Sequence, residues 1–178
     1  MENALTPAGG AFDAIAEALD DRYGGWLSVA AQRRAVRERL VAAFPVGARV
    51  LEIGGGTGED ALFLARRGRE VVMTDAAPAM VRVARAKLAG VAGASGRVAA
   101  AEELGDLVEA PFDGAFSNFA ALNCVADLAA FAAGVAARLR PGAPLLLVLF
   151  GPLPPAEIAV QLARGDAQAA FRRLRRGA

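Results

Sequence analysis

Short apolar runs alternate with segments of helical periodicity along most of the chain. Strands are predicted where these runs fall, at residues 49–53, 70–75, 96–101, 112–119 and 144–150. The runs lack the polar alternation of a half-exposed strand, which is typical of parallel strands that are buried on both faces. The pattern therefore predicts an α/β protein with a doubly wound, mostly parallel sheet.

Helices are expected between the strands and at both ends of the chain. They are predicted at residues 11–21, 26–44, 59–68, 77–90, 127–142 and 156–175. Pro45 ends the second of these helices, because the residue before a proline avoids helical geometry. We expect a single domain, 1–178, with an N-terminal helical lid at 1–46, a cofactor-binding core at 47–150 and a C-terminal helix at 151–178.

Composition narrows the chemistry that this domain can perform. The 20 Lys and Arg residues nearly balance the 19 Asp and Glu residues, so the net charge gives no reason to expect nucleic acid or an anionic membrane. The chain has no histidine, which excludes imidazole bases and His-based metal sites, and no metal is expected. The single cysteine, Cys124, is expected to be a small buried residue. The first residues lack a signal-peptide pattern, so we expect a cytoplasmic protein.

The segment "VLEIGGGTGED", residues 50–60, places glycines directly after the first strand. Glycines let backbone amides approach a ligand, and the helix that follows offers unpaired N–H groups; a tight turn without a ligand is the alternative. The dinucleotide motif requires glycine where the chain has Glu59, and no lysine follows as in a P-loop. The acids Glu52, Glu59 and Asp60 would repel a polyphosphate and favour a zwitterionic or cationic ligand.

The stretch "LEIGGGTG" resembles the E-x-G-x-G-x-G motif of class I S-adenosylmethionine-dependent methyltransferases. Asp75 ends the second strand, where that family places an acid that binds the ribose hydroxyls. The segments "FDGAFSNFAALNCVADL" and "LRPGAPLLLVLF" extend the likeness to about residue 150. The resemblance implies the Rossmann-like methyltransferase fold, S-adenosylmethionine as cofactor, and methyl transfer. The acceptor is expected to be a small molecule, since the chain departs from the N/D-P-P-Y motif of enzymes that act on DNA or protein.

The resemblance also implies a set of cofactor-binding residues. These are Glu52, Gly54, Gly56, Gly58, Asp75, Ala101, Glu102 and Asn118. Glu52 would act near the ammonium group of the cofactor, directly or through water, or would only fix the loop. Asp75 would bind the ribose or cap the next helix. At the adenine end, Ala100 or Ala101 stands where related enzymes often carry an acid; Ala101 and Glu102 would read the base there, or Glu102 would be an acid at a helix start.

Three residues are expected on the acceptor side of the site. Tyr23 lies in "FDAIAEALDDRYGG", which resembles the N-terminal lid of small-molecule methyltransferases; it either contacts the acceptor or packs between two helices. Asn118 follows the fourth strand and would line the pocket beside the transferred methyl, or form a strand-end turn. Asn123 is a second tentative substrate contact. The sequence identifies no catalytic base.

The family's sheet has seven strands in the order 3-2-1-4-5-7-6, whereas this sequence predicts only the first five. Strands 6 and 7 are expected to be missing, which leaves an apolar edge strand. We therefore expect a shortened or truncated methyltransferase, and a possible homodimer through the fifth strand or the C-terminal helix. One rival function is a domain that binds S-adenosylmethionine or S-adenosylhomocysteine without catalysis. Another is a nicotinamide-dependent oxidoreductase, which Glu59 disfavours.

Overall fold

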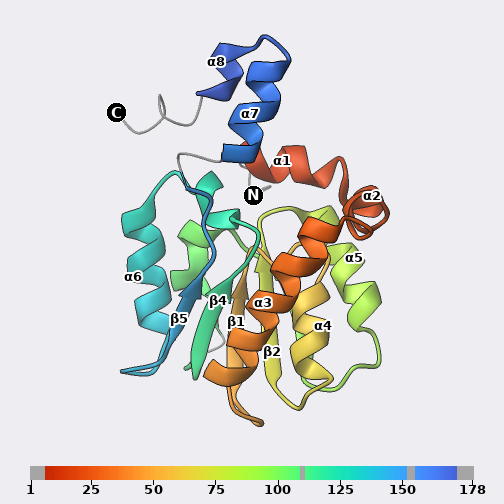
Figure 1. Cartoon of the computed structure of the whole chain (residues 1–178). Helices are drawn as coiled ribbons and strands as arrows, with labels where there is room; N and C mark the ends of the chain where they lie inside the picture. Colours follow the sequence, from red (N-terminus) through yellow and green to blue (C-terminus); the bar gives the residue numbers. More distant parts are fainter. Residues whose placement is uncertain (1–6, 109–110, 152–154, 172–178) are drawn as a thin grey trace. The chain divides into compact units, whose positions relative to one another are not determined.

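A parallel sheet forms the core of the first 148 residues in a computed structural model that describes residues 7–108, 111–151 and 155–171. Its strands are β1 (Arg49–Ile53), β2 (Glu70–Asp75), β3 (Ala94–Val98), β4 (Gly114–Ser117) and β5 (Leu145–Leu147). The strand order is β3-β2-β1-β4-β5, and every neighbouring pair is parallel (Figure 1). The predicted doubly wound sheet is confirmed, and its strand order reverses between β1 and β4.

Helices cover both faces of this sheet. They are α3 (Leu27–Ala43), α4 (Glu59–Ala65), α5 (Pro78–Leu88), the short 3-10 helices η2 (Ala101–Asp106) and η3 (Ala121–Cys124), and α6 (Leu128–Arg138). Adjacent apolar residues of a strand point to opposite faces. Val50 packs in the cluster that includes α3, α4 and α5, whereas Leu51 packs in the cluster that includes η2 and α6. Burial on both faces explains why the strand sequences are almost continuously apolar.

The N-terminal prediction of one helix over residues 11–21 is wrong. The chain instead forms α1 (Pro7–Asp13), the 3-10 helix η1 (Ala16–Ala18) and α2 (Leu19–Tyr23). Ile15, Ala16 and Leu19 pack with residues of α5, whereas Phe12 is 44% exposed. The apolar spacing thus does not correspond to one buried stripe, because the chain bends after Asp13.

Three strands differ from their predicted extents, and β4 forms only over Gly114–Ser117 of the predicted 112–119. The register with β2 pairs Val71 with Ala94, so β3 begins two residues before the predicted start at 96. The last strand pairs with β4 only from Leu145 to Leu147, because β4 itself ends at Ser117. β5 is the edge of the sheet, and Leu145 and Leu147 are each 38% exposed. The described residues contain no sixth strand, as expected.

The chain divides into two compact units, Met1–Val148 and Leu149–Ala178. In the described part of the second unit, the predicted helix 156–175 is two helices, α7 (Pro155–Ala163) and α8 (Ala167–Ala170). Gly165 has a φ of +75° between them, and the Asp166 carboxylate caps α8, which explains the break. The predicted residues beyond 171 lie outside the described part. No helix of the described residues is long and apolar enough to span a membrane.

Candidate functional site

The glycine loop, residues 54–58, joins β1 to α4 at the carboxyl ends of the strands, next to the reversal of strand order. Ligands of doubly wound sheets bind at this position. Gly54, Gly56 and Gly58 have φ values of +67°, +55° and +79°, in the left-handed region that favours glycine. A Cβ at Gly54 would lie 2.3 Å from the Cβ of Ala121, whereas the nearest atom to one at Gly56 is 4.0 Å away. Gly54 therefore packs against protein, and Gly56 has the more open backbone.

Glu52 lies beneath this loop and is only 2% exposed. A Cβ at Gly55 would lie 2.9 Å from its carboxyl carbon, so the loop covers the acid closely. Burial raises the pKa of Glu52 well above its usual value, and the negative charges of Asp60 and Asp75 raise it further, against a hydrogen bond from the Ala61 backbone. Its Oε2 atom is buried without a hydrogen-bond partner among the described residues. Such an oxygen favours a proton or a positively charged donor.

Asp75 closes the glycine loop from the end of β2. Its Oδ2 atom accepts a hydrogen bond from the Gly56 amide at 2.8 Å, and its Oδ1 atom accepts one from the Ala77 amide at 2.9 Å, in the turn before α5. Burial raises the pKa of Asp75, while these two hydrogen bonds oppose the shift. The capping alternative is therefore present in the structure. The ribose role stays a prediction, and each carboxylate oxygen keeps a second lone pair for it.

Asn118 is buried at the end of β4 and faces the first turn of α4. Its amide nitrogen donates to Asp60 Oδ2 at 2.8 Å, and its oxygen accepts from the Phe119 amide at 2.7 Å and from Gln32 Nε2 at 3.4 Å. Phe119 and Ala120 have φ values of +52° and +59°, a conformation that non-glycine residues seldom adopt. Backbone strain of this kind clusters at binding sites. Asn118 thus lies in a strained strand-end turn beside the loop.

At the predicted adenine end, Ala101 begins η2, three residues after β3 ends at Val98. The Glu102 carboxylate accepts a hydrogen bond from the Ala126 amide at 2.9 Å, which joins η2 to the segment before α6. The Glu103 carboxylate accepts one from the Ala100 amide at 3.2 Å. Glu103 therefore acts as an acid at a helix start. The adenine roles of Ala101 and Glu102 stay predictions.

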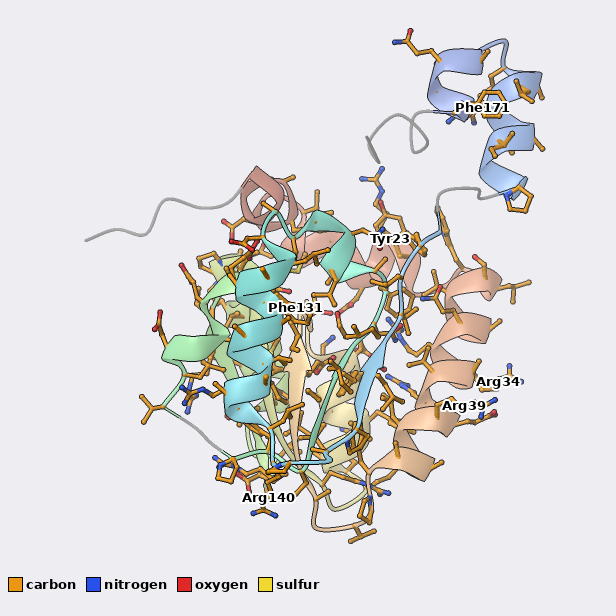
Figure 2. The ribbon with its side chains drawn as sticks, turned by 90° about the vertical axis from the view of Figure 1, so that its left-hand side faces the viewer. Tyr23, Arg34, Arg39, Phe131, Arg140 and Phe171 are labelled. Carbon is orange, nitrogen blue, oxygen red and sulfur yellow. The ribbon has the colours of Figure 1, made fainter. Side chains whose placement is uncertain are left out.

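The proposed acceptor-side residues come from two different elements. Tyr23, at the end of α2, packs edge-to-face on Trp26 with ring centroids 5.1 Å apart. Figure 2 shows Tyr23 at the opposite end of its unit from Arg140, which precedes β5 and so marks the amino ends of the strands. Asn123 lies exposed in η3. Cys124 next to it is also exposed, so the prediction of a buried cysteine is wrong, because Leu122 is the residue that η3 buries.

Comparison with known protein families shows which family this chain belongs to. The sequence model of a family described as a methyltransferase domain matches residues 50–142, the part that contains the glycine loop, Asp75 and Asn118. The chain belongs to this methyltransferase family. No curated protein matches the sequence of this methyltransferase domain.

Three solved structures illustrate the proteins that share this fold. DhpI in complex with S-adenosylhomocysteine is 26% identical, with a TM-score of 0.62 over 77% of this chain and 64% of that one. CalS10 of Micromonospora echinaspora, an amino pentose methyltransferase with bound S-adenosylmethionine, is 29% identical, with a TM-score of 0.58 over 85% and 59%. A protein that converts a disulfide bond into a thioacetal group during echinomycin biosynthesis is 32% identical, with a TM-score of 0.59 over 72% and 54%. The chain spans less than two thirds of each.

The methyltransferase domain also contains a charged cluster that the sequence did not predict. The Lys87 ammonium, on α5, donates to Asp20 Oδ2 at 2.6 Å, to Glu59 Oε1 at 2.7 Å and to Thr57 Oγ1 at 3.3 Å. The Thr57 hydroxyl in turn donates to Asp20 Oδ1 at 2.7 Å. We call these four residues the Lys87 cluster. The one available signal was that Lys87 is the only lysine in a chain with 19 arginines.

A second ion pair joins α3 to the first turn of α4. Arg37, on α3, donates from Nε to Asp60 Oδ1 at 2.7 Å and from a terminal nitrogen to the Glu59 carbonyl at 2.8 Å. Glu59 and Asp60 are thus paired with Lys87 and Arg37, and they do not present unbalanced charge to a ligand. This corrects the sequence-based argument that all three acids near the loop select a cationic ligand. Of those three, only Glu52 has a buried carboxylate oxygen without a hydrogen-bond partner among the described residues.

The described residues contain no group of three or more acids and cysteines that could hold a metal ion.

Proposed function

We propose that the chain binds S-adenosylmethionine and transfers its methyl group to a small-molecule acceptor. The observation that carries this proposal is the unpartnered, buried Oε2 atom of Glu52 beneath the glycine loop. Membership of the methyltransferase family supports it. Further support comes from CalS10 and DhpI, which share the fold and hold S-adenosylmethionine and S-adenosylhomocysteine respectively.

The residues at the carboxyl ends of the strands fit this cofactor. The Glu52 carboxylate would hold the methionine ammonium, directly or through water, and that positive charge would favour the ionised form which burial disfavours. The open backbone at Gly56 would lie along the methionine portion. Asp75 would accept hydrogen bonds from the ribose hydroxyls, and Ala101 and Glu102 would contact the adenine.

The bound cofactor supplies a methyl group that its sulfonium has already activated. The chain's own residues then have to exclude water and align an acceptor, and alignment alone can contribute roughly 7–11 kcal/mol. Because the sequence has no histidine, a reaction that needs no imidazole base is favoured. Acceptors of this kind are thiolates, carboxylates and neutral amines. Tyr23 and Asn123 are the proposed acceptor contacts, beside Asn118.

Calorimetry of the full chain tests cofactor binding. S-adenosylmethionine and S-adenosylhomocysteine should bind, whereas NAD, NADH and ATP should bind far more weakly. Tighter binding of a dinucleotide or of ATP would refute the proposal, since the glycine loop would then recognise phosphates.

Transfer requires its own measurement. Methyl-labelled cofactor is incubated with a panel of small amines, thiols, carboxylic acids and phenols, and formation of S-adenosylhomocysteine and labelled product is followed. Product formation supports the enzyme. Binding without product from any acceptor class supports the alternative, a domain that holds the cofactor without transferring its methyl group.

A further inference from the structure

The N-terminal segment, residues 7–23, lies against the glycine loop through its last helix. Leu19 Cδ2 is the nearest atom to the position that a Cβ at Gly56 would occupy, at 4.0 Å. The next residue, Asp20, accepts the hydrogen bond from Thr57 inside the loop. The segment therefore borders the position at which the loop backbone is most open.

The apolar contacts of this segment are directed elsewhere. Ala16 is buried, and it packs with Ala77, Ala79 and Met80, which belong to α5 and the turn before it. Asp13 accepts a hydrogen bond from the Ala79 amide at 2.6 Å, so it also binds the start of α5. These contacts hold the segment on α5. The polar contact to the loop itself is made by the Lys87 cluster.

The Lys87 ammonium is the centre of that cluster because its three acceptors come from three different elements. Asp20 belongs to α2, Thr57 to the glycine loop and Glu59 to the first turn of α4. An ammonium has three N–H donors on one atom, which suits three acceptors that converge on a point. A guanidinium spreads its donors over a planar fork and does not have this geometry. The only lysine of an arginine-rich chain thus occurs where an arginine would not fit the contacts.

The surrounding charges favour the ionised form of Asp20. Burial raises the pKa of Asp20, but the hydrogen bonds from Lys87 and Thr57 and the charge of Arg33 outweigh it, so the pKa of Asp20 is lowered. Glu59 lies between two cations, with Lys87 at 2.7 Å and Arg37 at 3.8 Å. The Lys87 side chain is 20% exposed, so solvent screens the cluster only in part.

We propose that Lys87 is a positioning residue, whose ammonium attaches the N-terminal segment to the glycine loop and so builds one wall of the cofactor site. Without that ammonium, the segment stays on α5, and only the hydrogen bond from Thr57 to Asp20 and the contact of Leu19 beside Gly56 still join it to the loop, so it opens from the loop more often. Cofactor then dissociates faster, because the wall beside Gly56 is no longer fixed. The effect on cofactor rests on the proposed function, whereas the attachment of the segment does not.

The first test replaces the ammonium with an apolar chain of similar length, Lys87→Met, in the full-length protein. Hydrogen exchange of the amides at 15–23 is measured without any ligand, and it should become about tenfold faster, since a local contact is lost while the core is kept. Affinity for S-adenosylhomocysteine should fall about fivefold at low salt, and the difference from the wild type should shrink at high salt. Unchanged exchange at 15–23 would overturn the proposal.

Arg82→Met is the matched control. Arg82 is also a cation on α5 that pairs with the N-terminal segment, at 3.2 Å from Glu17, but the two side chains are 65% and 82% exposed. Exposed pairs contribute little. Exchange and affinity should therefore stay within about twofold of the wild type. A change as large as that of Lys87→Met would mean that any cation of α5 serves, which contradicts a specific role for Lys87.

Lys87→Arg separates geometry from charge. It keeps the positive charge, so a purely electrostatic attachment predicts wild-type exchange at 15–23. The convergence of three acceptors predicts instead that exchange becomes faster, to between the wild type and Lys87→Met. Wild-type behaviour would refute the three-acceptor role.

Asp20→Asn provides a second variant if Lys87→Met does not fold, because Asp20 lies outside the core. Faster exchange at 15–23 is expected here too. Combined with Lys87→Met, it should add little to the single change, since both remove the same contact. Additive effects would show that the two residues act independently and would overturn the proposal.

If neither the wild type nor any variant binds S-adenosylhomocysteine while hydrogen exchange at 15–23 responds as described, the proposed function fails and the attachment of the segment by Lys87 stands.

Discussion

The glycine loop and the N-terminal segment meet at the same site but are held by different forces. Backbone hydrogen bonds hold the loop: the Gly55 amide donates to the Thr74 carbonyl at 2.9 Å, and the Gly58 amide donates to the Gly55 carbonyl at 3.0 Å. The segment reaches the loop through the side chains of Asp20, Thr57 and Lys87. Backbone and packing contacts are insensitive to salt, whereas charged side chains are not. One wall of the site is therefore rigid, and the other is adjustable.

The largest effect is expected from breaking the rigid wall. Gly54→Ala introduces a Cβ only 2.3 Å from the Cβ of Ala121 in a left-handed conformation, so it should destabilise the fold by about 2–5 kcal/mol. Gly90→Ala is the control, because Gly90 has a similar φ of +76° with no atom within 4 Å of the added Cβ. It should cost only about 1–2 kcal/mol. Urea unfolding measures both; equal losses would show that the contact with Ala121 is unimportant.

Asp75→Ala tests the same wall from β2. The Gly56 amide loses its acceptor and the ribose hydroxyls lose their proposed partner, so cofactor affinity should fall by on the order of 1–3 kcal/mol. Calorimetry with S-adenosylhomocysteine measures the loss. Wild-type affinity would remove Asp75 from the cofactor site and leave it only as the residue that closes the loop.

Glu52→Gln should change stability and affinity in opposite directions. The folded-state pKa of Glu52 lies above its unfolded value of 4.5, so ionisation destabilises the fold increasingly as pH rises through that interval. The neutral amide avoids this cost, and the thermal midpoint near neutral pH should rise by about 2–4 °C. The advantage should vanish below about pH 4.5, where wild-type Glu52 is protonated in both states.

Affinity for the cofactor should fall in the same Glu52→Gln variant, by about tenfold, because the methionine ammonium loses a charged partner. A variant that is more stable and binds equally well would show that Glu52 only fixes the loop.

The smallest expected effect concerns the adjustable wall on α5. Asp13→Ala removes the acceptor of the Ala79 amide at the start of that helix, and it should destabilise the fold by about 1 kcal/mol. The position of α2 on the loop should not change, because the Lys87 cluster is intact. Thermal unfolding measures the loss of stability, and hydrogen exchange of the amides at 15–23 reports on the position of α2. Faster exchange at Asp20 would mean that α1 also supports the contact with the loop.

Much of the core could be predicted from sequence, for a physical reason. Residues 49–53 are an apolar run followed by the glycine loop, and residues 70–75 are an apolar run that ends in an acid. Continuous apolar runs of this length are typical of parallel strands buried on both faces. The contacts that fix α2 could not be predicted. They join residues 20, 57, 59 and 87, which meet only after the sheet has placed α4 beside α5. The helical apolar spacing at Ile15 and Leu19 predicts one continuous helix. Apolar periodicity does not show which charged residues will pair, so it does not show where the chain bends.

The site was predicted in part for similar reasons. Glycine positions with positive φ follow from local backbone demands, so Gly54, Gly56 and Gly58 could be singled out from the motif. The pairing of Asp60 with Asn118 could not be, since it crosses from α4 to β4 and depends on the strained turn at Phe119. The sequence predicts Glu59 and Asp60 as ligand-facing charges because it does not show their partners Lys87 and Arg37.

The chain carries one side-chain amine, and it is engaged by three oxygen atoms. Acylation requires a free lone pair on the nitrogen, so a brief pulse of an amine-directed acylating reagent would modify Lys87 mainly during moments when these oxygen atoms release it. Mass spectrometry of the peptide containing residue 87 would then count those moments directly, so the opening frequency of the first helices can be followed in the unaltered protein, with no engineered probe.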